Sequence, residues 1–331
     1  MDWFWSVLDL LVAPFRHFLS PGDRMSYVYL TASLFIAVSY YLITEARKGT
    51  LKPAGLVRWL LPKEILSHPS AQVDFAFFYV NRVLQAALYG SVIVFSPAVA
   101  AGTKSLLTAA FGPPAAGYQP SVGITILTTL ILVLVLDFTM WLAHYIYHKV
   151  PFLWDYHKVH HSAEVMTPIT AGRMHPIEEL SDSALAAITL GSTYAALGYF
   201  LGDAAKELTI YEINIVIALF FYAAFHLRHS HVWIRYPYWL QHIFVCPAQH
   251  QIHHSVDKKH WDKNMGFIFA FWDWAAGTLY APKEREEITF GLGTEEDGGT
   301  WHSLKALYFL PFKQSWEKLR PKKDVPQEPA E

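Results

Sequence analysis

Long apolar runs constrain this chain more than any other feature. Five stretches approach the about 20 residues that a helix needs to cross a bilayer, at 25–43, 73–100, 122–143, 184–201 and 208–225. The composition agrees, because 53% of the residues are hydrophobic and only 16% are charged, against about 25% charged in soluble domains. We predict an all-α, polytopic membrane protein with about four to five transmembrane helices.

Charge and cysteine content exclude several classes of protein. The 26 Lys and Arg residues are balanced by 28 Asp and Glu residues, whereas a nucleic-acid-binding protein needs a basic face to neutralise phosphates. The single cysteine, Cys246, excludes a disulfide within the chain and a thiolate zinc or iron–sulfur cluster. Histidine, with 17 residues, is abundant by contrast.

The distribution of basic residues predicts the orientation. With five spans, most Lys and Arg residues fall on one side, which the positive-inside bias places in the cytoplasm. Residues 1–121 are expected to hold an N-terminal interfacial helix and the first spans, residues 122–283 the catalytic region, and residues 284–331 a cytoplasmic extension. Its tail, residues 321–331, combines proline and charge and is expected to be disordered.

Three histidine boxes stand out, namely HYIYH at 144–148, HKVHH at 157–161 and HQIHH at 250–254. Spacings of three and four place side chains on one face of a helix, so the imidazoles of each box are expected to converge on one point. The predicted spans bring all three boxes to the same cytoplasmic surface of the membrane. A metal site is the simplest explanation, with eight candidate ligands: His144, His148, His157, His160, His161, His250, His253 and His254.

The histidines leave the identity of the metal open. Imidazole suits zinc, copper, iron and nickel. Eight nitrogens exceed what one tetrahedral or octahedral ion uses, so two metals sharing the set is the expected count. Two irons would activate oxygen, whereas two zincs would not.

Further residues are expected around this set. His175, which precedes Pro176 at the predicted start of a helix, and His229 are candidate additional ligands, with His226 and His231 as alternatives to His229. Carboxylates and amides beside ligating imidazoles commonly accept the second ring N–H. The candidates for that role are Asp137, Asp257, Asp262 and Asn264, although Asp257 and Asp262 equally fit a solvated face with the neighbouring lysines.

The order of these motifs resembles the fatty acid hydroxylase/sterol desaturase superfamily. HYIYH and HKVHH are followed by RMHPIE, HSHV, QHQIHHSVD, DKNMG and FWDWAAGT between about residues 137 and 280. The first two boxes of acyl-CoA desaturases are farther apart, so that family is less similar. The resemblance implies that the eight box histidines are di-iron ligands and that His175 and His229 match additional histidines of the family. His231 departs from its pattern.

The resemblance also implies the chemistry. Two Fe²⁺ ions and O₂ would hydroxylate a C–H bond of a membrane lipid, with desaturation as the alternative outcome and no catalytic residue beyond the metal ligands. Sterols, fatty acyl chains, ceramides, alkylglycerols and aminolipids such as ornithine lipid are compatible substrates. We favour a polar-lipid hydroxylase of a bacterial inner membrane, because the C-terminal EPAE lacks an endoplasmic-reticulum retrieval signal.

Electrons must come from a partner, since the chain has no dinucleotide fingerprint and no cysteine set for a cluster. A ferredoxin or a b-type cytochrome with its reductase is expected. A basic C-terminal segment fits either an acidic donor or anionic lipid; it contains Lys313, Lys318, Arg320, Lys322 and Lys323. Two rival functions are a divalent-metal transporter, whose ligands would lie within the spans, and a zinc hydrolase, for which an HExxH motif is missing.

Overall fold

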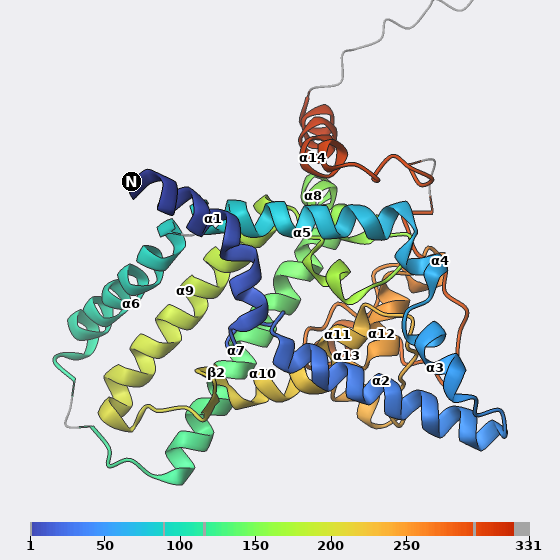
Figure 1. The fold of residues 1–331 in the computed structure, drawn as a ribbon. Helices are drawn as coiled ribbons and strands as arrows, with labels where there is room; N and C mark the ends of the chain where they lie inside the picture. Colours follow the sequence, from blue (N-terminus) through green and yellow to red (C-terminus); the bar gives the residue numbers. More distant parts are fainter. Residues whose placement is uncertain (1, 89, 115–116, 294–295, 321–331) are drawn as a thin grey trace, which may run out of the picture.

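The computed structural model describes residues 2–88, 90–114, 117–293 and 296–320, and these residues fold mostly into helices, with almost no strands (Figure 1). The predicted all-α class is confirmed. The predicted disordered tail, with Lys322 and Lys323, lies outside this part of the chain. The elements are α1 (Asp2–Leu19), α2 (Tyr27–Lys48), α3 (Pro53–Leu60), α4 (Lys63–Leu66), α5 (Pro69–Leu88), α6 (Gly90–Phe111), α7 (Val122–Lys149), α8 (Pro151–His161), α9 (Pro176–Leu201), β1 (Thr209–Ile210), β2 (Ile213–Asn214), α10 (Ile215–Phe220), α11 (His226–Arg228), α12 (Pro247–His253), α13 (Phe271–Ala276) and α14 (Leu304–Leu319).

Three helices of the described chain are long and apolar enough to cross a membrane. They are α2, α7 and a segment that begins with α9 and extends to Ala204. These helices correspond to the first, third and fourth predicted spans. The chain is therefore an integral membrane protein, with fewer candidate spans than the four to five predicted.

The second predicted span is divided between two helices, α5 and α6, on either side of residue 89. Polar side chains on α5 explain the difference, since they bind other parts of the protein and do not face lipid. Asp74 pairs with Arg173 at 2.7 Å, and Asn81 donates a hydrogen bond of 2.8 Å to the Met174 carbonyl. Such groups are costly in hydrocarbon but are satisfied inside the protein.

The fifth predicted span is interrupted near its beginning by a small antiparallel hairpin. Thr209 lies opposite Asn214 in this hairpin, and its turn residues Tyr211 and Glu212 have φ values of 51° and 64°. The apolar helical segment Ile215–Arg228 that follows is shorter than the roughly 20 residues that a span requires. This part of the fifth predicted run is therefore not among the candidate spans of the described residues.

The remaining helices cover one end of this bundle. Figure 1 shows α6, α9 and α7 side by side, with α5 running across their ends and α1 packed against α5. The α1 segment is a helix as predicted, while its place at the membrane interface stays a prediction. Helix α14 packs against α8 and α5. The ends of α7 and α8 consequently lie beside α11 and α12, which places all three histidine boxes in one region.

Candidate metal centre

Local helix chemistry places each histidine box at a helix end. Helix α7 ends at Lys149, and Pro151 starts α8 immediately afterwards, because proline is favoured in the first turn of a helix but not in its interior. The first box therefore occupies the last turns of α7 and the second the last turns of α8. The third box ends α12, with His254 as its C-cap. His229 follows α11 with the non-helical angles φ −104° and ψ 64°.

Nine histidines converge in two adjacent groups, and within each group the ligand atoms lie within 4.8 Å of one another. Both groups draw on the second and third boxes. We call them the five-histidine group and the four-histidine group. The five-histidine group contains His144, His148, His157, His161 and His253, and the four-histidine group contains His160, His229, His250 and His254.

The expectation that each box converges on one point is wrong for the second and third boxes. Successive residues of a helix are rotated by about 100°, so residues four apart differ by only about 40° while residues three apart differ by about 60° in the opposite sense. His157 and His161 accordingly share one group, and His160 points into the other. In the third box, His250 and His254 stay together and His253 points away.

Seven of the nine imidazoles lie outside the candidate spans, and these seven are neutral at physiological pH. Burial is the main cause, and neighbouring histidines or arginines add to it by disfavouring a further positive charge. The pKa of His160 is lowered to about 3 in this way. The pKa values of the following rings are lowered well below the usual value of histidine: His157, His161, His229, His250, His253 and His254.

The donor set fits two metal ions. The Nε2 atoms of His229 and His250 are 3.0 Å apart, and those of His157 and His161 are 3.2 Å apart. The buried Nε2 atoms of His144, His148 and His253 have no hydrogen-bond partner in the part of the chain described. Unprotonated nitrogens directed at one point, without partners of their own, are what a metal ion needs from imidazole ligands.

Protein acceptors orient most rings of the five-histidine group. His144 Nδ1 lies 2.9 Å from the Met265 carbonyl oxygen, and His253 Nδ1 lies 2.7 Å from the Lys263 carbonyl oxygen. His148 Nδ1 lies 3.3 Å from Asp262 Oδ1. These contacts fix the tautomer that leaves Nε2 free for a metal. Of the four carboxylates and amides expected in this role, Asp262 is the one that reaches a ligand ring.

Glu178 performs the same role and was missed from the sequence. Its Oε1 lies 2.7 Å from Nδ1 of His157, and both side chains are buried. The available signal was the pair of carboxylates, Glu178 and Glu179, in the first turn of a largely apolar helix that follows the RMHP segment. An intramembrane carboxylate is expected to have a specific partner, but the sequence does not say which histidine it meets.

Asp137, Asn264 and Asp257 do not contact a ligand ring. Asp137 accepts hydrogen bonds from the backbone N–H groups of Ile268 and Phe269, at 2.6 Å and 3.2 Å. Asn264 bonds the backbone of Gln249 and Tyr280. Asp257 is exposed and pairs with Lys259. Asp137 and Asn264 instead bind the backbone of the loops behind the site. Asp257 belongs to a solvated face.

His175, a predicted ligand, lies outside both groups. It caps α9, as the proline after it predicted, with Nδ1 accepting a hydrogen bond of 3.1 Å from the Ile177 N–H. Its Nε2 lies 3.1 Å from the Tyr308 carbonyl oxygen. Both ring nitrogens are therefore engaged by the protein.

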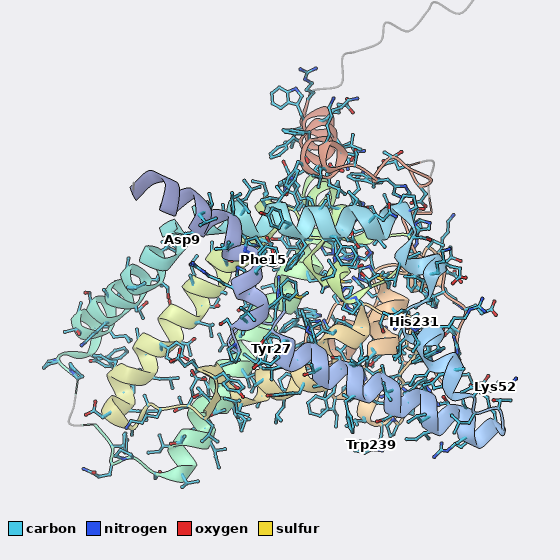
Figure 2. The ribbon with its side chains drawn as sticks, in the orientation of Figure 1. Asp9, Phe15, Tyr27, Lys52, His231 and Trp239 are labelled. Atoms are coloured by element: carbon cyan, nitrogen blue, oxygen red, sulfur yellow. The ribbon has the colours of Figure 1, made fainter. Side chains whose placement is uncertain are left out.

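The three neighbouring histidines of the HLRHSHV segment have different surroundings. His229 lies in the four-histidine group. His226 is buried against Phe225, outside both groups. His231, which is labelled in Figure 2, packs against Trp59 of α3, with ring centroids 5.0 Å apart.

Two cavities reach the histidines from different sides. One, of about 110 Å³, touches both groups and is lined by apolar side chains such as Met140, Phe225 and Phe267, together with Arg24 and Arg228. The other, of about 430 Å³, touches only the five-histidine group. Its wall includes Trp154, Lys158, Trp261 and Lys318. The histidines of the centre thus border two separate cavities.

Comparison with known proteins identifies the segment that carries this centre. Residues 129–278, which include all nine converging histidines, match the fatty acid hydroxylase family. The resemblance inferred from the histidine boxes is therefore confirmed over this segment.

Three curated relatives are similar over part of their length. Alkylglycerol monooxygenase of Caenorhabditis elegans is 28% identical over 58% of this chain and 34% of its own. Ornithine lipid hydroxylase OlsE of Rhizobium tropici is 30% identical over 47% of this chain and 43% of its own. Very-long-chain aldehyde decarbonylase GL1-1 of Oryza sativa subsp. indica is 27% identical over 46% of this chain and 24% of its own. The chain thus spans less than half the length of these relatives. No solved structure matches it significantly.

Proposed function

We propose that this protein is a membrane-bound oxidoreductase that hydroxylates a C–H bond of a membrane lipid, with two iron ions and O₂. The observation that carries the proposal is the pair of adjacent histidine groups that border one cavity. The five-histidine group would hold one ion and the four-histidine group the other. When bound, the irons supply the redox chemistry that lets O₂ attack an unactivated C–H bond.

The protein side chains position the substrate and exclude water. The cavity that touches both groups is lined by Met140, Phe225 and Phe267, a surface suited to an alkyl chain. Arg24 and Arg228 line the same cavity together with Glu178 and Asp182, and these charged groups suit a polar part of the lipid. A lipid with a polar head group therefore fits better than a plain hydrocarbon, and two relatives are named for an alkylglycerol and an ornithine lipid.

Electrons would enter through the larger cavity. It opens beside α14, and Lys318 on its wall forms an ion pair of 2.5 Å with Asp155. Trp154 on the same wall packs against His148 and His161, with ring centroids 5.0 Å and 5.1 Å apart. We assign this face to an acidic ferredoxin or to a b-type cytochrome with its reductase. We place the protein in a bacterial inner membrane with this face toward the cytoplasm, the orientation that the positive-inside bias predicts.

The test combines metal content with lipid mass spectrometry in an aerobically grown host, with and without the protein. Two irons per chain and a lipid heavier by one oxygen atom would support the hydroxylase. A lipid lighter by two hydrogen atoms would show that the protein desaturates its substrate and does not hydroxylate it. Bound zinc with unchanged lipids, in a host that supplies ferredoxin, cytochrome b and their reductases, would contradict the proposal and favour a hydrolase.

A further inference from the structure

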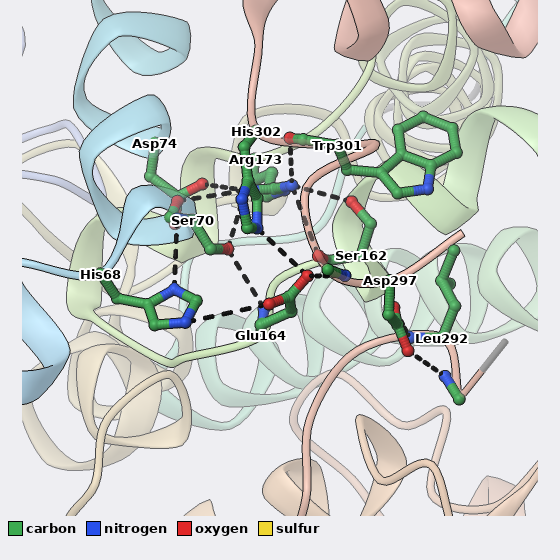
Figure 3. Close-up of polar contacts among 12 residues, drawn as sticks. His68, Ser70, Asp74, Ser162, Glu164, Arg173, Leu292, Asp297, Trp301 and His302 are labelled. Carbon is green, nitrogen blue, oxygen red and sulfur yellow. Dashed lines mark hydrogen bonds and ion pairs between the residues drawn. The ribbon is translucent and has the colours of Figure 1, made fainter. Parts of the chain in front are cut away.

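A third group of metal-binding side chains lies outside the centre described above. It consists of His68, Glu164 and His302, whose ligand atoms lie within 4.8 Å of one another. His68 precedes α5, Glu164 follows α8, and His302 precedes α14. Figure 3 shows both histidine rings next to the Glu164 carboxylate. Three segments that are distant in the sequence therefore contribute one donor each.

The geometry of the three donors is that of an open ligand set. His302 Nε2 lies 3.1 Å from Glu164 Oε1, and His68 Nε2 lies 3.8 Å from Glu164 Oε2. The two rings are nearly perpendicular, with centroids 5.7 Å apart. His302 Nε2 is buried, and the Glu164 carboxylate is the group that it meets. One carboxylate thus faces two imidazole nitrogens, which are donors that a divalent cation can share.

One buried arginine holds all three segments in place. Arg173 pairs with Asp74, and neither side chain is exposed. Its guanidinium also donates hydrogen bonds beside each of the three donors (Figure 3). The acceptors are Ser70 Oγ at 3.3 Å, Ser162 Oγ at 2.9 Å and the Trp301 carbonyl at 3.1 Å.

Further hydrogen bonds fix Glu164 itself. Its backbone N–H donates to Ser70 Oγ at 3.1 Å, and its Oε1 accepts from the Gly298 N–H at 2.9 Å. The donors are thus arranged by the surrounding protein before any ion binds. Such preorganisation distinguishes a built site from a chance encounter of surface side chains.

We propose that His68, Glu164 and His302 bind a zinc ion that fastens these three segments together. Two imidazoles and one carboxylate form a known zinc ligand set, which leaves one position for water. His68 is 31% exposed, so water can reach that position. Its Nδ1 accepts a hydrogen bond of 3.2 Å from the Ser70 N–H. Zinc at Nε2 would move the ring proton to Nδ1, so binding costs this one long hydrogen bond.

The test uses the full-length, iron-loaded protein in lipid nanodiscs, exposed to zinc sulfate and then freed of excess metal. We expect the wild type to retain one more zinc per chain than H302A, with the same iron content in both. Zinc should also raise the Tm of the wild type by a few degrees, because an ion that binds only the folded state stabilises it. H302A should not respond.

Two further variants keep the test decisive. E164Q preserves the size of the side chain and an acceptor for Gly298, so it replaces H302A if that variant does not fold. H242A removes a histidine that bonds the Tyr238 carbonyl and belongs to none of the three groups, so it should retain the additional zinc. Equal zinc content and equal thermal response in the wild type and both site variants would overturn the proposal, as would zinc uptake only at the expense of iron.

Discussion

The two histidine groups are built from the same side chain but are held in place differently. In the five-histidine group, the outer nitrogens of four rings meet a carbonyl or carboxylate oxygen, as His157 meets Glu178. In the four-histidine group, the Nδ1 atoms of His229, His250 and His254 have no hydrogen-bond partner among the described residues. Those rings pack edge to face, with the centroids of His229 and His250 4.5 Å apart. Hydrogen bonds orient one group, and packing orients the other.

This difference predicts different metal affinities. An acceptor on the outer nitrogen fixes the tautomer and makes the imidazole a stronger ligand. The five-histidine group is therefore expected to retain its metal longer than the four-histidine group when a chelator is added. Loss of both metals at one rate would contradict the comparison.

The largest effect is expected from removing a ligand of the weaker group. His160→Ala should lower activity by more than about 100-fold and release the metal of the four-histidine group, while the protein stays in the membrane. Metal content and lipid turnover of the purified protein measure both effects. Full activity in this variant would contradict the assignment of the group as a metal site.

Glu178→Gln is expected to have the next largest effect, because it weakens the hydrogen bond that orients His157. We expect a loss of about 10–100-fold in metal affinity or activity, confined to the five-histidine group. Asp257→Asn is the matched control, since Asp257 is exposed and contacts no ligand ring. Equal losses in both variants would show that Glu178 does not act through His157.

Asp273→Asn should have a smaller effect on metal binding, because Asp273 contacts the backbone that holds a ligand ring and not the ring itself. Asp273 accepts hydrogen bonds from the N–H groups of Met265 and Gly266, at 3.1 Å and 2.7 Å, and so positions the Met265 carbonyl beside His144. An amide keeps one acceptor oxygen, so we expect a loss of less than about tenfold in metal affinity. Chelator competition measures it, and a loss as large as that of Glu178→Gln would refute this order.

His175→Asn should leave metal content unchanged and alter only the pH dependence of stability. Burial lowers the pKa of His175 to about 4, from about 6.5 in the unfolded chain. Between these values the unfolded state binds the additional proton, so the free energy of unfolding falls as the pH decreases, by about 3 kcal/mol at pH 4. The asparagine variant, which still caps α9, should lose less stability in this window of a denaturant titration. Loss of metal would instead restore His175 as a ligand.

Much of this site follows from the sequence because helix geometry is local. Spacings of four residues keep His144 with His148, His157 with His161, and His250 with His254 wherever the helices lie. The apolar runs similarly predicted α2, α7 and α9. A single segment in lipid can form all of its backbone hydrogen bonds internally only as a helix. The RMHP segment predicted a helix start at Pro176, which the structure confirms.

Other features depended on contacts between distant segments. The division of the histidines into five and four arises where α7, α8, α11 and α12 meet, and no spacing within one box encodes that meeting. Glu178 meets a ligand ring and Asp137 does not, because α9 brings Glu178 against His157 of α8. The third group likewise depends on tertiary contacts, since Arg173 bonds residues beside each of its three members. Local periodicity determined which side chains can act together, and tertiary packing decided which of them do.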